Sequence, residues 1–165
     1  MTPIQMANVA AIIANRGHYY TPHVVHRIEG VNEIPEKYRV KHRTMISPTT
    51  FDPVIRGMLL VNESGTAAGV SIKGINIAGK TGTVQNPHGK NHAAYMAFAP
   101  AENPRIAIAV IVEEAGYGAT WAAPIGQVNM GRPLNTRMFL LGILVLPALA
   151  GMTTVASLTP SPPRT

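Results

Sequence analysis

The stretch INIAGKTGTVQ, from Ile75 to Gln85, begins as an apolar strand and then sets one lysine among glycines and threonines. Alternation along a flat strand would put Thr81 and Thr83 on one face and Lys80 on the other, so the strand must twist or Lys80 must reach round its edge. A cation beside hydroxyl groups can bind a carboxylate, and N–H groups at an exposed strand end can face a developing oxyanion. The pattern therefore indicates one wall of an anion-binding cleft.

The two glycines of this stretch, Gly79 and Gly82, remove side chains where a ligand or another backbone comes close. A simpler interpretation also fits the residues, namely a solvent-exposed lysine between turn-forming glycines at a strand end. Because three-residue motifs recur by chance, Lys-Thr-Gly alone does not decide between a cleft and an ordinary strand end.

The segments that follow predict two more strands, at His92 to Ala99 and Arg105 to Glu113. Their links, NPHGKN and PAENP, are short and rich in turn-forming residues, so an antiparallel meander is the natural pairing. The third strand, IAIAVIV, is apolar on both faces and should lie inside the sheet or beneath helices.

Helices are expected on either side of this meander. The first begins at a capping box formed by Thr2 and Gln5, with Pro3 in the first position, and ends at Gly17. A second should start between Ser47 and Thr50, run to Asn62 and bury Val54, Ile55, Met58, Leu59 and Val61. A third begins near Thr120. The expected fold is α/β (α+β), an antiparallel sheet meander flanked by helices.

Residues 126–165 differ in composition from residues 1–125 and are expected to form an atypical tail. The segment 138–152 is almost entirely apolar and approaches the ~20 residues that span a bilayer. Three interpretations remain open: a membrane segment, a buried core helix broken by Gly142 and Pro147, or sequence foreign to the preceding domain, through a frame change or fusion.

Charge and histidine patterns exclude two other classes of function. The net charge is +6, but the basic residues are scattered, and the one dense patch, EKYRVKHR, is typical of a solvated loop or hairpin and not of a nucleic-acid interface. The pair His23 and His26 follows Pro22 in extended sequence, and the pair His88 and His92 straddles a glycine turn. Without a carboxylate cluster beside them, neither pair predicts a metal site.

Beyond the triplet, longer stretches resemble the penicillin-binding transpeptidases. TPIQMANVAAIIANRG looks like a helix of that family, and FDPVIRGMLLVNESGTA is similar to the helix before its Lys-Thr-Gly strand. AGKTGTVQ and then HAAYMAFAPAENPRIAIAVIVEEAGYGATWAAPI resemble that strand, the next two strands and the entry to the last helix. The match runs in order from Thr2 to Ile125 and favours class B enzymes of the elongation type, penicillin-binding protein 2. The resemblance implies a penicillin-binding transpeptidase or serine β-lactamase-like fold, of which this chain is a part.

The resemblance also implies roles for individual residues. Lys80 would support proton movement and carboxylate binding, and the hydroxyls of Thr81 and Thr83 would hold the terminal carboxylate of a D-Ala-D-Ala stem peptide or a β-lactam. The backbone N–H of Thr83 would donate to the oxyanion, and Gly82 would leave room beside the scissile carbonyl. The loop 116–120, GYGAT, would line the cleft.

Two motifs of the family are missing from these 165 residues. No serine has a lysine three residues later, and no S-x-N occurs. Both motifs precede the first helix in the family, so we expect a fragment that is inactive alone, cut from a parent that cross-links peptidoglycan through a serine acyl-enzyme.

The resemblance places that parent at the periplasmic face of the bacterial inner membrane. It requires no metal or organic cofactor, and its partners would be the stem peptide, β-lactams and a cell-wall elongation glycosyltransferase, with no nucleic acid. The alternative is a non-catalytic binding or membrane-associated module that retains the Lys-Thr-Gly half-site. In-frame coding sequence for S-x-x-K and S-x-N would decide between the two.

Overall fold

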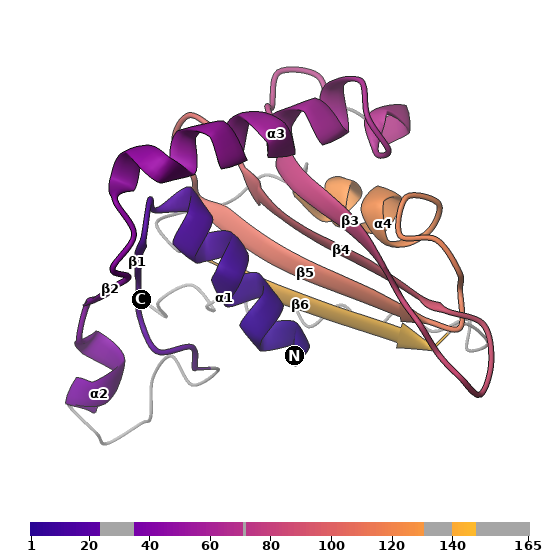
Figure 1. The fold of residues 1–165 in the computed structure, drawn as a ribbon, viewed down its shortest axis with the longest axis horizontal. Helices are drawn as coiled ribbons and strands as arrows, with labels where there is room; N and C mark the ends of the chain where they lie inside the picture. Colours follow the sequence, from indigo (N-terminus) through magenta and orange to yellow (C-terminus); the bar gives the residue numbers. More distant parts are fainter. Residues whose placement is uncertain (24–34, 71, 131–139, 148–165) are drawn as a thin grey trace, which may run out of the picture.

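A four-stranded sheet forms the centre of the protein (Figure 1). The computed structural model describes residues 1–23, 35–70, 72–130 and 140–147. The strand order is β3-β4-β5-β6, in which β3 and β5 pair antiparallel with β4 and β6 runs parallel to β5. The strands span Ala78–Val84 (β3), His92–Ala99 (β4), Ile106–Glu113 (β5) and Leu140–Pro147 (β6). The predicted meander of three antiparallel strands is confirmed, and it leaves β3 at one edge of the sheet.

The apolar strand β5 lies in the interior of the sheet, as its composition predicts. It has β4 on one side and β6 on the other, and its residues from Ile106 to Val110 are all buried. Side chains from both of its faces enter hydrophobic clusters, with Ile108 on one side and Ala107 on the other. A strand covered on both faces needs no polar alternation, and this explains the unbroken run IAIAVIV.

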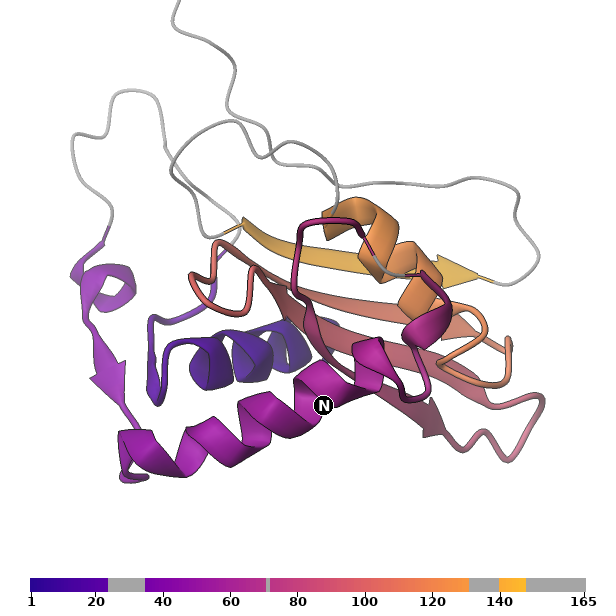
Figure 2. The ribbon, with the colours of Figure 1, turned by 90° about the horizontal axis from the view of Figure 1, so that it is seen from above.

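Helices cover both faces of the sheet (Figure 2). Helices α1, Pro3–Ala14, and α3, Phe51–Glu63, share a cluster with one face, and the 3-10 turn η1, Pro48–Thr50, leads into α3. The opposite face packs against α4, Ala122–Met130, which also contacts the 3-10 turn η2, Ala68–Val70. The core is therefore divided into two layers, one on each side of the sheet.

The first helix begins and ends as its sequence predicts. The Thr2 hydroxyl accepts a hydrogen bond from the Gln5 N–H at 3.4 Å, and the Gln5 side-chain carbonyl accepts one from the Thr2 N–H at 2.7 Å. These reciprocal contacts form a capping box. Arg16 and Gly17 adopt φ values of +51° and +99°, and the Gly17 N–H donates to the Ile12 carbonyl, so the chain leaves the helix through two successive residues of positive φ.

Helix α3 buries a narrower face than expected. Phe51, Ile55, Met58 and Asn62 are buried, while Leu59 and Val61 pack partly against the clusters. The prediction for Val54 was wrong, because this side chain is 45% exposed. At about 100° per residue the four buried positions fall within an arc of roughly 60°, and Val54 lies about 40° beyond its edge.

The segments before α3 form a small two-stranded sheet apart from the main one. Strand β1, His18–Tyr19, pairs antiparallel with β2, His42–Arg43, and α2, Glu36–Arg39, precedes β2. The basic patch EKYRVKHR therefore lies in a short helix and one strand of this small sheet, and all its residues except Tyr38 and His42 are exposed.

The apolar tail contributes a strand over the part that the structure describes. Two of its three interpretations expect a helix, which either spans a membrane or lies in the core. The described part of the segment instead forms strand β6, which pairs with β5 from Ile106↔Leu140 to Glu113↔Pro147. Within the described ranges, no helix combines the length and the apolar character needed to span a bilayer. The interpretation as foreign sequence and the boundary at residue 125 stay predictions.

Candidate functional site

The Lys-Thr-Gly motif lies on β3, the edge strand of the sheet. Thr81 stands opposite Tyr95 of β4, which is buried on the α4 side, and Lys80 stands opposite Met96, which packs on the α1 side. Paired residues of neighbouring strands share a face, so the threonine and the lysine project from opposite faces, as strict alternation requires. The Lys80 ammonium nevertheless donates to the Thr81 main-chain carbonyl at 2.6 Å. The Lys80 side chain thus bends back round the edge of the strand toward Thr81, which is one of the two arrangements that the sequence allowed.

The hydroxyl groups of this strand are accessible to a ligand. Thr83 and Lys80 are exposed, and Thr81 is half-buried. The Thr81 hydroxyl lies 2.9 Å from the hydroxyl of Thr66, in the turn after α3. Thr66 was not among the residues that the sequence singled out, although it lies in the stretch FDPVIRGMLLVNESGTA, which carries part of the family resemblance.

The two glycines of β3 serve different purposes. A Cβ on Gly79 would stand 2.3 Å from the Tyr95 hydroxyl oxygen and 2.6 Å from the ring carbon that carries it. A Cβ on Gly82 would find its nearest neighbour, the Cβ of Ala94, at an ordinary 3.6 Å. Gly79 therefore makes room for a buried side chain and not for a ligand or another backbone, while a side chain at Gly82 would make only an ordinary contact with Ala94.

The loop before α4 packs directly against the motif. A Cβ on Gly118 would stand 2.4 Å from the Gly82 carbonyl oxygen and 2.3 Å from that of Ala94. Gly118 is buried between these backbones, and its neighbour Tyr117 is 73% exposed. The structure thus brings the loop 116–120 beside the motif; its role in lining a cleft stays a prediction.

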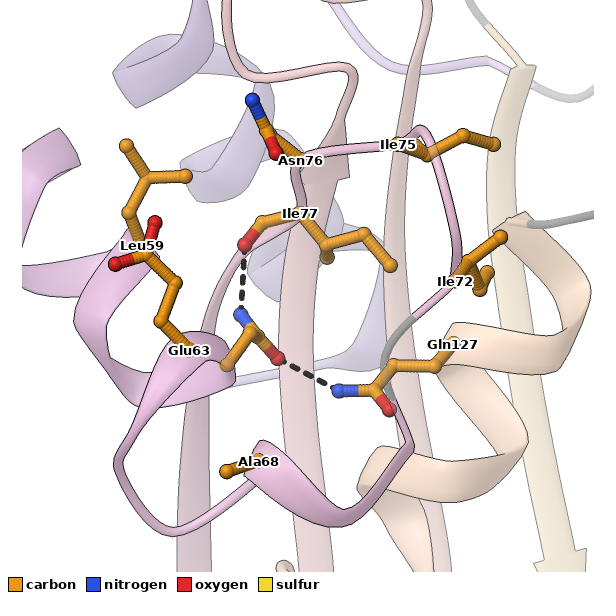
Figure 3. A pocket seen from close by; sticks show the side chains of 9 residues that line it. Leu59, Glu63, Ala68, Ile72, Ile75, Asn76, Ile77 and Gln127 are labelled. Atoms are coloured by element: carbon orange, nitrogen blue, oxygen red, sulfur yellow. Dashed lines mark hydrogen bonds between the residues drawn. The ribbon is translucent and has the colours of Figure 1, made fainter.

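A buried polar network lies on the α4 side of β3. The side-chain oxygen of Asn62 accepts hydrogen bonds from the Tyr95 hydroxyl and from the Gln127 amide nitrogen, both at 2.7 Å. The Asn62 amide nitrogen donates to the Ile77 carbonyl at 2.9 Å, and the Gln127 nitrogen donates to the Ala67 carbonyl at 3.0 Å. Figure 3 shows Gln127 and Ile77 at this network, in the wall of a pocket between α3, α4 and the residues that lead into β3.

Burial raises the pKa of Tyr95 to about 12, and side-chain hydrogen bonds that involve Gln127 and Asn62 offset part of that rise. The phenol therefore stays protonated throughout the physiological range, as its donation to Asn62 requires. Sequence reasoning overlooked this network, although the spacing of Asn62 from Ile55 and Met58 places it on the buried stripe of α3.

Neither candidate histidine pair gathers ligands in the described part of the chain. His26 lies outside the described residues, and His92 Nδ1 accepts a hydrogen bond from the Glu114 N–H at 3.0 Å. Over the same ranges, no group of three or more His, Asp or Glu side chains is placed to hold a metal ion. The candidate site is thus built from hydroxyls, one ammonium and main-chain groups.

This sheet, with its Lys-Thr-Gly edge strand and covering helices, matches a known family. Residues 1–130 match the penicillin-binding protein transpeptidase domain. The chain belongs to this family, and its fold is of the penicillin-binding and β-lactamase-like type.

Relatives with assigned names support the same conclusion. The chain is 35% identical over 152 residues to the peptidoglycan D,D-transpeptidase PbpA of Mycolicibacterium smegmatis, covering 82% of this chain and 30% of that protein. It is 31% identical to MrdA of Haemophilus influenzae, covering 83% of this chain and 24% of the relative. Among solved structures, PBP2 of Pseudomonas aeruginosa matches with 36% identity and a TM-score of 0.68, over 85% of this chain and 31% of that one.

The chain therefore spans about a third or less of these relatives. Penicillin-binding protein A of Mycobacterium tuberculosis, 33% identical over 79% of this chain and 30% of its own, with a TM-score of 0.62, was solved as an imipenem acyl-enzyme complex. The similarity to PBP2, PbpA and MrdA agrees with the class B resemblance of the sequence.

Proposed function

We propose that these residues form the Lys-Thr-Gly half of a peptidoglycan D,D-transpeptidase site, which cross-links stem peptides through a serine acyl-enzyme and binds β-lactams. The observation that carries the proposal is the position of the motif on an accessible sheet edge, in a chain whose relatives are named D,D-transpeptidases.

In this proposal the substrate carboxylate binds at the hydroxyls of Thr81 and Thr83. A carboxylate accepts several hydrogen bonds, and hydroxyl groups without charged partners can donate to it. Lys80 lies at the same edge, where its charge favours an anion and can support proton movement. Its present contact with the Thr81 carbonyl is one that a ligand or a neighbouring serine can replace.

The oxyanion donor would be the main-chain N–H of Thr83. Alternate residues of an edge strand direct their N–H and C=O groups away from the neighbouring strand. The Lys80 contact places the Thr81 carbonyl among these outward groups, and Thr83, two residues further, has the same orientation. Gly82 leaves the space between them free of a side chain.

The nucleophile would come from chain outside these 165 residues, because S-x-x-K and S-x-N are absent from them. Acyl transfer needs a nucleophile and a group that accepts its proton. The chain alone should therefore not acylate. For the complete protein we propose the periplasmic face of the inner membrane and a glycosyltransferase partner in cell-wall elongation, with no cofactor.

The proposal is tested by intact mass spectrometry after incubation with excess benzylpenicillin. The 165-residue chain should show no mass increase, whereas a polypeptide that joins it in frame to segments with S-x-x-K and S-x-N should gain one benzylpenicillin. Replacement of Thr81 and Thr83 by valine in that polypeptide should slow acylation by roughly two to four orders of magnitude, since two hydrogen bonds to a charged group, about 1.5–3 kcal/mol each, are lost. A stoichiometric adduct on the 165-residue chain would overturn the split-site assignment.

A further inference from the structure

The turn after α3 brings a third hydroxyl to the Lys-Thr-Gly edge. The Thr66 hydroxyl lies 2.9 Å from that of Thr81, fifteen residues further along the chain, and Thr66 is exposed. Each hydroxyl carries one proton and can accept further hydrogen bonds, so the direction of this contact is set by what else binds. If the Thr81 proton points to an anion, Thr66 must be the donor between the two.

Short-range contacts hold the Thr66 turn in one shape. The Ala67 N–H donates to the Val61 carbonyl at 2.9 Å, which closes the turn onto the end of α3. A Cβ on Gly65 would stand 2.8 Å from the Val61 Cα, so the chain passes too close to the helix for a side chain at this position. The residues on both sides of Thr66 are thereby fixed.

The buried network then fixes this turn relative to β3. Gln127 donates from one nitrogen to the Ala67 carbonyl in the turn and to Asn62. Asn62 also accepts from Tyr95, the residue directly opposite Thr81 on β4. The Asn62 side-chain oxygen therefore connects the turn that carries Thr66, through Gln127, to strand β4, which pairs with Thr81 through Tyr95.

We infer that Thr66 is a positioning residue of the carboxylate site, which donates to Thr81 and so directs the Thr81 proton toward the ligand. In a chain of hydrogen bonds each donor polarises the next, so the donation strengthens the bond from Thr81 to a carboxylate. This inference rests on the proposed function, because it assigns Thr66 to the same ligand as Thr81 and Thr83.

The test is an NMR titration of the 165-residue chain with ¹³C-labelled threonine methyl groups. The probe is N-acetyl-D-alanyl-D-alanine, and its C-terminal amide is the neutral control. The Thr81 methyl signal should shift with the carboxylate and much less with the amide. Thr66→Val keeps the shape and removes the donor, so it should weaken carboxylate binding roughly fivefold to tenfold, the effect of one hydrogen bond in a charged array.

Two further variants make the result specific. Thr66→Ser restores the hydroxyl and should return the affinity to within about twofold of the wild type, which a packing role of the methyl group would not do. In a Thr81→Val background, where binding is followed at the Thr83 methyl signal, Thr66→Val should have no additional effect, since the relay is already broken.

The outcomes separate the two proposals. Carboxylate-selective binding that is equally tight in the wild type and in Thr66→Val would overturn the role of Thr66 and leave the half-site in place. The absence of any carboxylate-selective shift at Thr81 in the wild type would overturn the half-site, and the inference with it. Weakening in Thr66→Val with recovery in Thr66→Ser would establish the positioning role.

Discussion

Replacement of Gly79 by alanine tests how tightly the Lys-Thr-Gly strand is built onto the sheet. The added Cβ would lie 2.3 Å from the Tyr95 hydroxyl oxygen, whereas ordinary contacts begin at 3.4 Å. Strand and ring must therefore separate by about 1 Å, and a shift of that size breaks the 2.7 Å bond from Tyr95 to Asn62.

The expected destabilisation follows from these two effects. Overpacking of a close-packed site costs about 1–3 kcal/mol, and a buried polar group left without its partner costs about 1–3 kcal/mol. The gain from the lower chain entropy of an unfolded alanine is about 0.4–1 kcal/mol in the opposite direction. We therefore expect Gly79→Ala to lower the free energy of unfolding by roughly 2–4 kcal/mol in urea titrations followed by circular dichroism.

The matched control is Gly82→Ala, three residues along the same strand. Its Cβ would meet the nearest atom at 3.6 Å, an ordinary contact, so the free energy of unfolding should not fall and should rise by up to about 1 kcal/mol through the lower entropy of the unfolded chain. In a Tyr95→Phe background the nearest clashing atom is absent, and Gly79→Ala should cost at least about 1 kcal/mol less than in the wild type. Equal effects of Gly79→Ala and Gly82→Ala, or strict additivity with Tyr95→Phe, would refute this reasoning.

Two other measurements follow from the same region. Gly118→Ala places a Cβ 2.4 Å from the Gly82 carbonyl oxygen. Because a main-chain atom cannot rotate away as a side chain can, the variant should lose about 2 kcal/mol or more of unfolding free energy. Unchanged stability in thermal denaturation would contradict the packing described for this loop. Burial raises the pKa of Tyr95 from 10.0 to about 12, so the folded chain holds the phenol proton more tightly than the unfolded chain. The contribution of Tyr95 to the free energy of unfolding is therefore fully present below pH 10. It is lost as the pH rises through 12, by roughly 2–3 kcal/mol in total. The decline should be smaller in Tyr95→Phe, and identical alkaline profiles would show that Tyr95 titrates normally.

Local sequence patterns predicted most of the elements that carry the site. Apolar runs bounded by turn-rich links predicted the three antiparallel strands, and the Thr2–Gln5 capping box predicted the start of α1. The Lys-Thr-Gly motif also identified the strand that holds the candidate site. Such signals succeed because each depends on residues a few positions apart, whose geometry the backbone itself dictates.

The surroundings of the motif could not be predicted in this way. The contact of Thr66 with Thr81 spans 15 residues, that of Tyr95 with Asn62 spans 33, and that of Gln127 with Asn62 spans 65. Nothing in the local pattern of an asparagine, a tyrosine or a glutamine specifies a partner at those separations. The error at Val54 has a related cause, because the apolar arc of α3 is wider than the stripe that faces the sheet, and its own sequence does not reveal which part of the arc will be buried.

Stability and site geometry are coupled at this edge of the sheet, and the coupling distinguishes the variants. Asn62 accepts hydrogen bonds from Tyr95, which lies opposite Thr81, and from Gln127, which also holds the turn that carries Thr66. Any change that moves Tyr95 should therefore disturb both the fold and the contact between the Thr66 and Thr81 hydroxyls. Thr66 itself is exposed, and within the described ranges its hydroxyl forms a hydrogen bond with the Thr81 hydroxyl alone, so Thr66→Val should weaken carboxylate binding with little loss of stability. Gly79→Ala should reduce both. If Gly79→Ala lost stability and bound the carboxylate probe as tightly as the wild type, the buried network would support the fold alone, and the placement of the hydroxyls would have to come from the turn itself.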